Sequence, residues 1–251
     1  MMVRQISNIA AAAGLLLIAG IPAHAQQPPA QPKAVVELFT SQGCSSCPAA
    51  DALFTELAKD PRLITLTLPV TYWDYLGWKD TLGQEAFSKR QKLYAKARGD
   101  GQIYTPQAVV NGSTHIVGSD KGGIDKLVKE QGKDGFPVKI DLAEADGALR
   151  INLGTAPFTG EKPAVVLLLQ VSRTATVPIE RGENSGKTVT YANVVRGISR
   201  IGEWNGAAAT LTVPLETVRS AAKADSYVVL VQGDPYARQS AILGAARGPA
   251  K

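Results

Sequence analysis

The chain has few of the side chains that bind metals or carry redox chemistry. Its 251 residues include two cysteines and two histidines, and one of the histidines, His24, lies close to the N-terminus. A metal site in the rest of the chain has only Cys44, Cys47 and His115 to draw on, whereas structural zinc sites usually have four protein ligands. We therefore predict no metal and no cofactor, and keep a copper or zinc clip through these three residues as a minor alternative.

Long apolar runs are also missing, apart from one near the N-terminus. There, Arg4 precedes the run IAAAAGLLLIAGI, and Ala23-His24-Ala25 offers a small-x-small cleavage site. This run is shorter than the roughly 20 apolar residues of a membrane-spanning helix, so residues 1–25 are predicted to be a signal peptide. We expect a periplasmic or secreted protein without stable membrane insertion, in a compartment where disulfides persist.

Clustered positive charge is absent as well. The formal net charge is +5 and the pI is about 9.2, but no run of five basic residues occurs. A dispersed excess of Lys and Arg is typical of a solvated surface. We therefore expect no nucleic-acid partner.

The strand and helix signals divide the chain into two regions. Residues 26–33 form a Pro-rich leader that we expect to be disordered. Between 34 and 133 the order is strand, helix, strand, helix, hairpin and helix, with the hairpin turn at Asn111-Gly112. This order predicts an α/β thioredoxin-like domain with a helical insertion. From 136 to 247, seven strand-like runs without a long helix predict an antiparallel β-sandwich-like domain.

The two cysteines are three positions apart, just before a predicted helix, in the segment TSQGCSSCPAAD. The positive end of a helix dipole lowers the pKa of a nearby thiol, so Cys44 is the candidate exposed, attacking cysteine. Cys47, more buried and followed by Pro48, is then the resolving cysteine. The alternative is a structural disulfide, although so short a loop removes little chain entropy.

A proline suited to a cis peptide bond opens the predicted hairpin. Thr105-Pro106 precedes the first hairpin strand, and cis bonds are in practice limited to X-Pro. We predict that this bond is cis and that Thr105-Pro106 docks an extended substrate, with Thr105, the residue before the proline, offering backbone hydrogen bonds. A trans proline at the start of a strand is the alternative.

Aromatic residues make up only 6% of the chain, yet four of them crowd the segment TYWDYLGWKD. Tyr72, Trp73 and Trp78 are candidate substrate-binding residues, because this segment follows the second strand at the edge where the cysteine loop is expected. Alternatively, they attach the helical insertion, or the β-rich domain, to the core. Glu37, seven residues before Cys44, is a candidate proton acceptor. The alternative is a Glu that points to a sheet edge or pairs with a Lys.

These motifs, QGCSSCP, YWDYLGW, YTPQAVVNG and HIVGSD, together resemble the secreted bacterial family called domain of unknown function 1223. The resemblance runs from about Val35 to Arg247 and implies a thioredoxin-fold domain followed by a β-rich domain. The family commonly has His and Asp where this chain has Pro69 and Thr71. Any tuning of the disulfide by those two polar groups is therefore missing here.

The sequence predicts an exported thiol-disulfide oxidoreductase-like protein. Its partners would be cysteine-containing exported proteins or a redox partner protein, and the disulfide itself would carry the electrons. The alternative is a non-catalytic envelope-binding or redox-sensing module with a structural disulfide, in which the loop RGENSGKT (181–188) offers a contact surface. Glutathione-linked transfer ranks last, because it suits the cytoplasm better than an exported protein.

Overall fold

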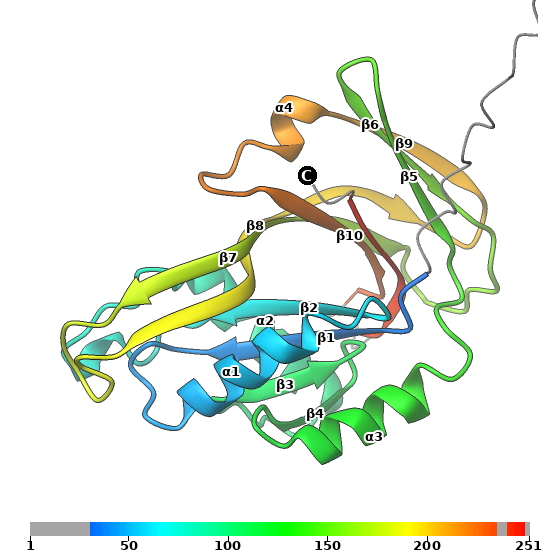
Figure 1. The fold of residues 1–251 in the computed structure, drawn as a ribbon. Coiled ribbons are helices and arrows are strands. Elements are labelled where there is room, and N and C mark those ends of the chain that lie inside the picture. The colour runs from blue at the N-terminus through cyan, green and yellow to red at the C-terminus, as the bar shows by residue number, and fades with distance from the viewer. Residues whose placement is uncertain (1–30, 235–239, 249–251) are drawn as a thin grey trace, which may run out of the picture.

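A computed structural model describes residues 31–234 and 240–248 (Figure 1). The predicted signal peptide and most of the predicted leader lie outside the described residues. The helical elements are α1 (Cys47–Leu57), the 3₁₀ turn η1 (Asp74–Leu76), α2 (Glu85–Arg98), α3 (Lys121–Gln131) and the short α4 (Leu215–Val218). In the described part of the chain, no helix has the length and apolar character needed to cross a membrane.

The strands form a large mixed sheet and a small antiparallel one. The large sheet has the order β11 (Ile242–Arg247), β10 (Ser226–Gln232), β7 (Ala164–Pro178), β8 (Thr188–Trp204), β2 (Leu63–Pro69), β1 (Ala34–Thr40), β3 (Gln107–Val110) and β4 (Thr114–Val117). The small sheet has the order β5 (Ile140–Ala145), β6 (Ala148–Leu153) and β9 (Ala209–Pro214).

Strand β1 lies in the interior of the large sheet and leads directly to the cysteine loop. It pairs in parallel with β2 and antiparallel with β3. All seven of its residues are buried, because helices cover both faces. Val36 and Leu38 pack with Phe54 of α1, whereas Val35 and Phe39 pack on the opposite side with residues such as Tyr94 of α2.

Local sequence signals account for several element ends. The predicted hairpin turn at Asn111-Gly112 is confirmed, with φ values of 47° and 69° that favour these two residue types. Helix α2 ends at Gly99, whose φ is +81°. Helix α3 is capped by Asp120, whose carboxylate accepts the backbone N–H of Gly123 (2.9 Å).

The seven strands predicted after residue 136 are all present, but they do not form a sandwich of their own. Four of them, β7, β8, β10 and β11, extend the sheet that contains β1. The junction is a short parallel contact between Thr67 of β2 and Val194 of β8. The Thr67 hydroxyl reinforces it by donating to the Ala192 carbonyl (2.7 Å). Only β5, β6 and β9 form the second sheet, and their apolar residues pack on the inner side of β7 and β10.

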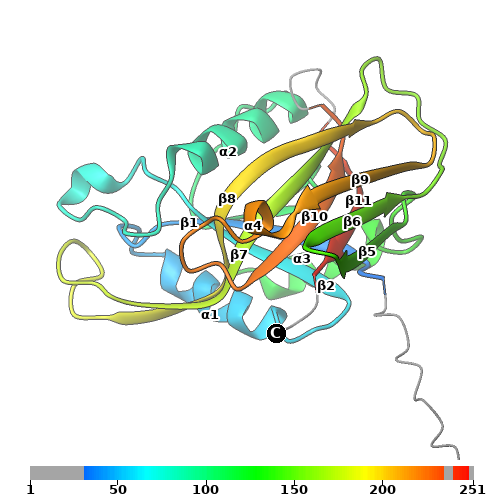
Figure 2. The ribbon, with the colours of Figure 1, turned by 90° about the horizontal axis from the view of Figure 1, so that it is seen from above.

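Strands β7 and β8 continue beyond the sheet as a two-stranded arm (Figures 1 and 2). Along the arm, residues 174–178 of β7 pair with residues 188–192 of β8. The tip that joins the two strands, residues 179–187, is called the arm tip below. Tyr191 of the arm is buried and packs with Leu82 and Val194, so the arm is attached to the body of the molecule.

Candidate functional site

The two cysteines form a disulfide at the N-terminus of α1. Their Cα atoms are 5.4 Å apart, and Cys47 is the first residue of the helix. The loop from Ser41 to Ser46 connects them to the carboxyl end of β1. The Ser46 hydroxyl lies 3.4 Å from the Cys44 sulfur, within hydrogen-bonding distance. The predicted disulfide-forming pair is therefore present, at the positive end of a helix.

The exposure predicted for Cys44 differs from the structure. Cys44 exposes only 3% of its surface and Cys47 exposes none. The arm tip accounts for part of this burial, because Asn184 donates from its amide to the Cys44 carbonyl (2.8 Å) and to the Gln42 carbonyl (2.9 Å). Local sequence patterns do not indicate this contact, because 140 positions separate Asn184 from Cys44.

The peptide bond between Thr105 and Pro106 is cis, as predicted. Trp73 connects this bond to the cysteine loop, because its indole N–H donates to the Thr105 hydroxyl (2.7 Å). A Cβ atom on Gly43 would lie 3.3 Å from the Cβ of Trp73. The cysteine loop, Trp73 and the cis-proline turn are thus neighbours at one edge of the sheet.

The other aromatic residues of this segment have different surroundings. Trp78 donates its indole N–H to the Gln42 side chain (2.8 Å) beside the cysteine loop. Tyr72 donates to Gln91 of α2 (3.1 Å), and burial raises its pKa to about 12. Tyr75 is 76% exposed and stacks on Trp73, with ring centroids 6.4 Å apart. Trp73 and Tyr75 therefore offer an aromatic surface next to the cis-proline turn.

A buried acid that sequence reasoning missed lies one helical turn after Cys47. Asp51 is 2% exposed and accepts a hydrogen bond from the Thr40 hydroxyl (2.8 Å). Burial raises its pKa to about 8, the Thr40 bond opposes this, and the charge of Asp80 adds to the increase. Asp51 therefore holds a proton near neutral pH. Helical spacing from Cys47 and Ala50 places it in the buried stripe of α1, and this signal was available in the sequence.

Asp80 ties the aromatic segment to the cysteine loop. Its carboxylate accepts the backbone N–H groups of Gln42 and Leu82, both at 2.8 Å. Burial raises its pKa to about 6, although the backbone hydrogen bonds act in the other direction. The pKa of Tyr191, on the arm, is raised by burial and by the charges of Asp51 and Asp80. Tyr191 therefore lies close enough to both acids for their charges to act on it.

Glu37, the predicted proton acceptor, faces away from α1. Its carboxylate forms an ion pair with Arg90 of α2, in which the shorter of two N···O distances is 2.7 Å. It also accepts a hydrogen bond from the Tyr94 hydroxyl. Residues alternate between the two faces of a strand, and the α1 side of β1 carries Val36 and Leu38. This placement argues against a role for Glu37 in proton transfer at the cysteines.

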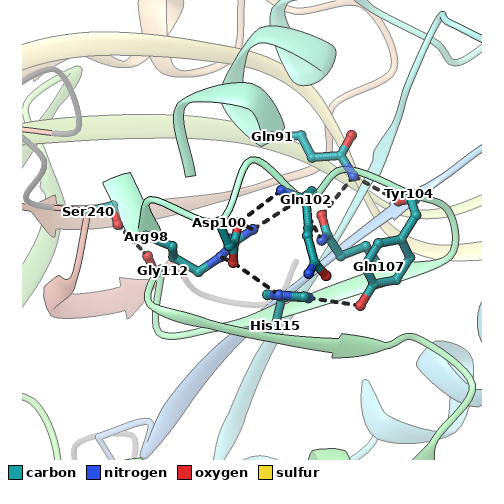
Figure 3. A network of polar contacts seen from close by, with 9 residues as sticks. All are labelled: Gln91, Arg98, Asp100, Gln102, Tyr104, Gln107, Gly112, His115 and Ser240. Carbon is teal, nitrogen blue, oxygen red and sulfur yellow. Dashed lines mark hydrogen bonds and ion pairs between the residues drawn. The ribbon is translucent and has the colours of Figure 1, made fainter. Parts of the chain in front are cut away.

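A network of polar side chains supports the segment that connects α2 to the cis-proline turn (Figure 3). Arg98 donates to Asp100 from two nitrogens (2.8 and 3.2 Å), and this interaction lowers the pKa of Asp100 to about 2. His115 lies 3.2 Å from Asp100 and 2.9 Å from the Tyr104 hydroxyl. Burial lowers the pKa of His115. Gln91 donates to the Tyr104 carbonyl (2.8 Å), so this segment is held from two sides.

The same network bears on the metal alternative. His115 makes its contacts with Tyr104 and Asp100, and the two cysteines are bonded to each other. Among residues 31–234 and 240–248 there is no group of three or more His, Cys, Asp or Glu side chains that could hold a metal ion.

Comparison with known proteins identifies a family and two structural relatives. The family profile described as "Protein of unknown function (DUF1223)" matches residues 35–232. The X-ray crystal structure of protein AGR_C_4864 from Agrobacterium tumefaciens is 32% identical with a TM-score of 0.76, and the match covers 88% of this chain and 96% of that one. HBP35 of Porphyromonas gingivalis is 14% identical with a TM-score of 0.63, over 88% and 76% of the two chains, a likeness of fold alone. No curated protein matches the sequence.

Proposed function

The chain belongs to the DUF1223 family, whose description assigns no activity, and we propose that it is an exported thiol-disulfide oxidoreductase-like protein. It would exchange disulfides through Cys44 and Cys47 with cysteines of exported proteins. The observation that carries this proposal is the disulfide at the N-terminus of α1, with Trp73 connecting its loop to the cis Thr105-Pro106 turn. A helix N-terminus stabilises the thiolate that such exchange needs.

The arrangement of the elements around the disulfide gives further support. Strands β1 and β2 run parallel on either side of α1 in the chain, and β3 and β4 form an antiparallel hairpin beside β1. Helix α3 then packs on the α1 side of the sheet. We propose that this part of the molecule is a thioredoxin-like unit, in which β8 continues the sheet at β2.

In the proposed reaction, a thiolate of the partner attacks the Cys44 sulfur and the bond between Cys44 and Cys47 breaks. Cys47 leaves as a thiolate and takes a proton from Asp51, which later recovers one from solvent. A second thiolate of the partner then attacks the partner sulfur of the mixed disulfide, and Cys44 leaves as a thiolate. Cys44 then takes a proton from solvent, which received the protons of the partner's two thiols, so that two electrons and two protons have passed to the cysteine pair. The reverse sequence reduces a partner disulfide.

The surface beside the disulfide suits an extended peptide. The turn at Thr105 and Pro106 would place its backbone along the peptide, and Trp73 and Tyr75 would contact an apolar side chain on it. Tyr72 and Trp78 would act indirectly, because their polar atoms are bonded to Gln91 and to the cysteine loop.

One observation favours the alternative of a binding or redox-sensing module with a structural disulfide. Both cysteine residues are nearly inaccessible, with exposures of 3% for Cys44 and 0% for Cys47. A disulfide that never becomes accessible would only stabilise the loop.

Two measurements separate the alternatives. In an oxidising periplasm, the variant Cys47→Ser is expected to accumulate mixed disulfides with partner proteins through Cys44, and Cys44→Ser, the matched control, is expected to accumulate none. For the wild-type pair, a reduction potential between about −120 and −270 mV in glutathione buffer is expected for an exchanging disulfide. A potential below about −300 mV, together with no captured partner, would establish the structural alternative.

A further inference from the structure

The arm formed by β7 and β8 brings a distant segment onto the disulfide. Its strands run past α1, where the Thr55 hydroxyl reaches the Thr190 carbonyl at 3.5 Å. At the other side of the tip, a Cβ atom on Gly182 would lie 3.2 Å from the Cβ of Trp78. The arm tip is therefore bordered by the aromatic segment and by α1, with the cysteine loop between them.

Asn184 anchors the arm tip to the cysteine loop. It is 1% exposed, and its amide nitrogen donates to the carbonyls of Gln42 and Cys44, on either side of Gly43. Its amide oxygen in turn accepts a hydrogen bond from the Lys187 ammonium (2.8 Å). The carbonyl of Cys44, the proposed attacking residue, thus accepts hydrogen bonds from the arm and from the backbone N–H of Cys47 (3.2 Å).

Glu183 brings a negative charge to the same place. Its carboxylate accepts the backbone N–H of Ser45, the residue after Cys44 (3.2 Å). A Cys44 thiolate would be stabilised by the same positive end of α1, and a neighbouring carboxylate disfavours a second negative charge. The other acids near the loop, Asp51 and Asp80, lie buried beneath it, and Lys187 is bonded to Asn184.

We propose that Asn184 and Glu183 are positioning residues of the disulfide site, and that the arm tip must move aside before a partner reaches Cys44. Asn184 holds the tip closed, and Glu183 restrains the nucleophilicity of Cys44 while the tip is closed. The inference rests on the proposed function for the role of the disulfide, but the contact of the arm tip with the cysteine loop is a property of the folded chain.

The first test measures how fast dithiothreitol reduces the disulfide in the folded, full-length protein. Asn184→Ala removes two hydrogen bonds from the closed state, so we expect reduction on the order of tenfold faster than in the wild type. Lys187→Met removes only the hydrogen bond that orients Asn184, and we expect it to speed reduction by about two- to fivefold. Glu180→Gln, a charge change at the exposed side of the same tip, is the control and should leave the rate unchanged. Circular dichroism and thermal unfolding show whether each variant is folded.

The second test concerns charge. After reduction of the protein, Glu183→Gln is expected to raise the rate at which iodoacetamide alkylates Cys44 at neutral pH by about two- to fivefold. The same variant should shift the thiolate absorbance near 240 nm to lower pH, a change that a purely structural residue does not produce. Glu180→Gln again serves as the control, because it removes a charge of the same sign from the same segment.

The outcomes separate this inference from the proposed function. Unchanged reduction rates in folded Asn184→Ala and Lys187→Met, with alkylation unchanged in Glu183→Gln, overturn the role of the arm tip. Faster reduction in these variants without any partner captured by Cys47→Ser retains the covering role and rejects disulfide exchange. Capture of partners by Cys47→Ser, with unchanged reduction rates in the arm-tip variants, supports disulfide exchange and rejects the covering role.

Discussion

Two carboxylates are buried on opposite sides of the large sheet, and their surroundings differ. On the α2 side, Glu37 is paired with the Arg90 guanidinium and with the Tyr94 hydroxyl. On the α1 side, Asp51 accepts a hydrogen bond from the Thr40 hydroxyl, and burial raises its pKa to about 8. A buried acid needs either a counter-charge or a proton. Glu37 has the first, and Asp51 holds the second.

This difference separates structural from chemical roles. The ion pair between Glu37 and Arg90, which the Tyr94 hydroxyl also contacts, holds α2 on the sheet. A protonated carboxyl one turn from Cys47 can give up its proton and recover it. The sequence position of Glu37, within the strand that leads to the cysteines, suggested the opposite assignment.

The largest expected effect is on the α2 side. Arg90→Met leaves Glu37 buried without its counter-charge, so we expect the free energy of unfolding to fall by about 3–5 kcal/mol. Urea titration measures this, with Lys92→Met on the exposed side of α2 as the control. The double variant Arg90→Met, Glu37→Leu removes both charges and should recover much of the loss. A double variant as unstable as the single one would mean that packing, and not the unpaired charge, is responsible.

On the α1 side, stability should depend on pH through Asp51. The folded pKa of about 8 lies above the ordinary value of 3.8, so the folded state keeps a proton that the unfolded state releases. The free energy of unfolding therefore falls as pH rises from about 4 to about 8, because the unfolded state ionises first. Between pH 6 and 8 we expect the wild type to lose about 2 kcal/mol of stability through Asp51, and Asp51→Asn not to show this loss.

Urea titrations of both proteins at several pH values measure this difference, and Asp125→Asn on exposed α3 is the control. Parallel pH profiles of the wild type and Asp51→Asn would contradict a protonated Asp51.

A smaller effect is expected for Tyr94→Phe. The Tyr94 hydroxyl bonds to Glu37 and also accepts hydrogen bonds from Arg90 (2.6 Å) and Gln232 (2.9 Å). Because the ion pair remains, we expect a loss of about 1–2 kcal/mol in the free energy of unfolding. Tyr75→Phe, in the exposed aromatic segment, should change stability by less than about 0.5 kcal/mol. A loss for Tyr94→Phe as large as that for Arg90→Met would place the main anchor of Glu37 at the hydroxyl.

The smallest effect is expected for Thr40→Val. The Thr40 hydrogen bond lowers the pKa of Asp51 against the effect of burial, so its removal should raise that pKa further. We expect a stability loss of about 1 kcal/mol that is greater at pH 9 than at pH 6, because the ionised form loses the donor. Thr114→Val on the edge strand β4 is the control. An equal loss at both pH values would show that the hydroxyl does not respond to the charge on Asp51.

Local features of the fold could be predicted from the sequence because they depend on neighbouring residues. Gly99, Asp120 and the Asn111-Gly112 turn each fix an element boundary through the backbone conformation or cap that they provide. The cis bond before Pro106 could be expected in the same way, from its place ahead of the hairpin.

Features that depend on distant residues could not be predicted. Alternation of apolar and polar residues identifies a strand, but it does not say which strand lies beside it. The pairing of β8 with β2 and the contact of Asn184 with Cys44 both join segments more than a hundred positions apart. The burial of Cys44 follows from these contacts, and for that reason the expected exposure was wrong.

The junction between β2 and β8 also affects how the chain reaches its native state. Strand β2 is buried along its whole length, yet a bond at this junction, from Thr67 to Ala192, spans 125 positions. Contacts of such separation form slowly, because a long loop must close before they contribute. Until β8 arrives, one edge of the apolar strand LITLTLP is unpaired and can add to a strand of another molecule. Nascent or partly unfolded chains are therefore expected to be prone to aggregate at β2.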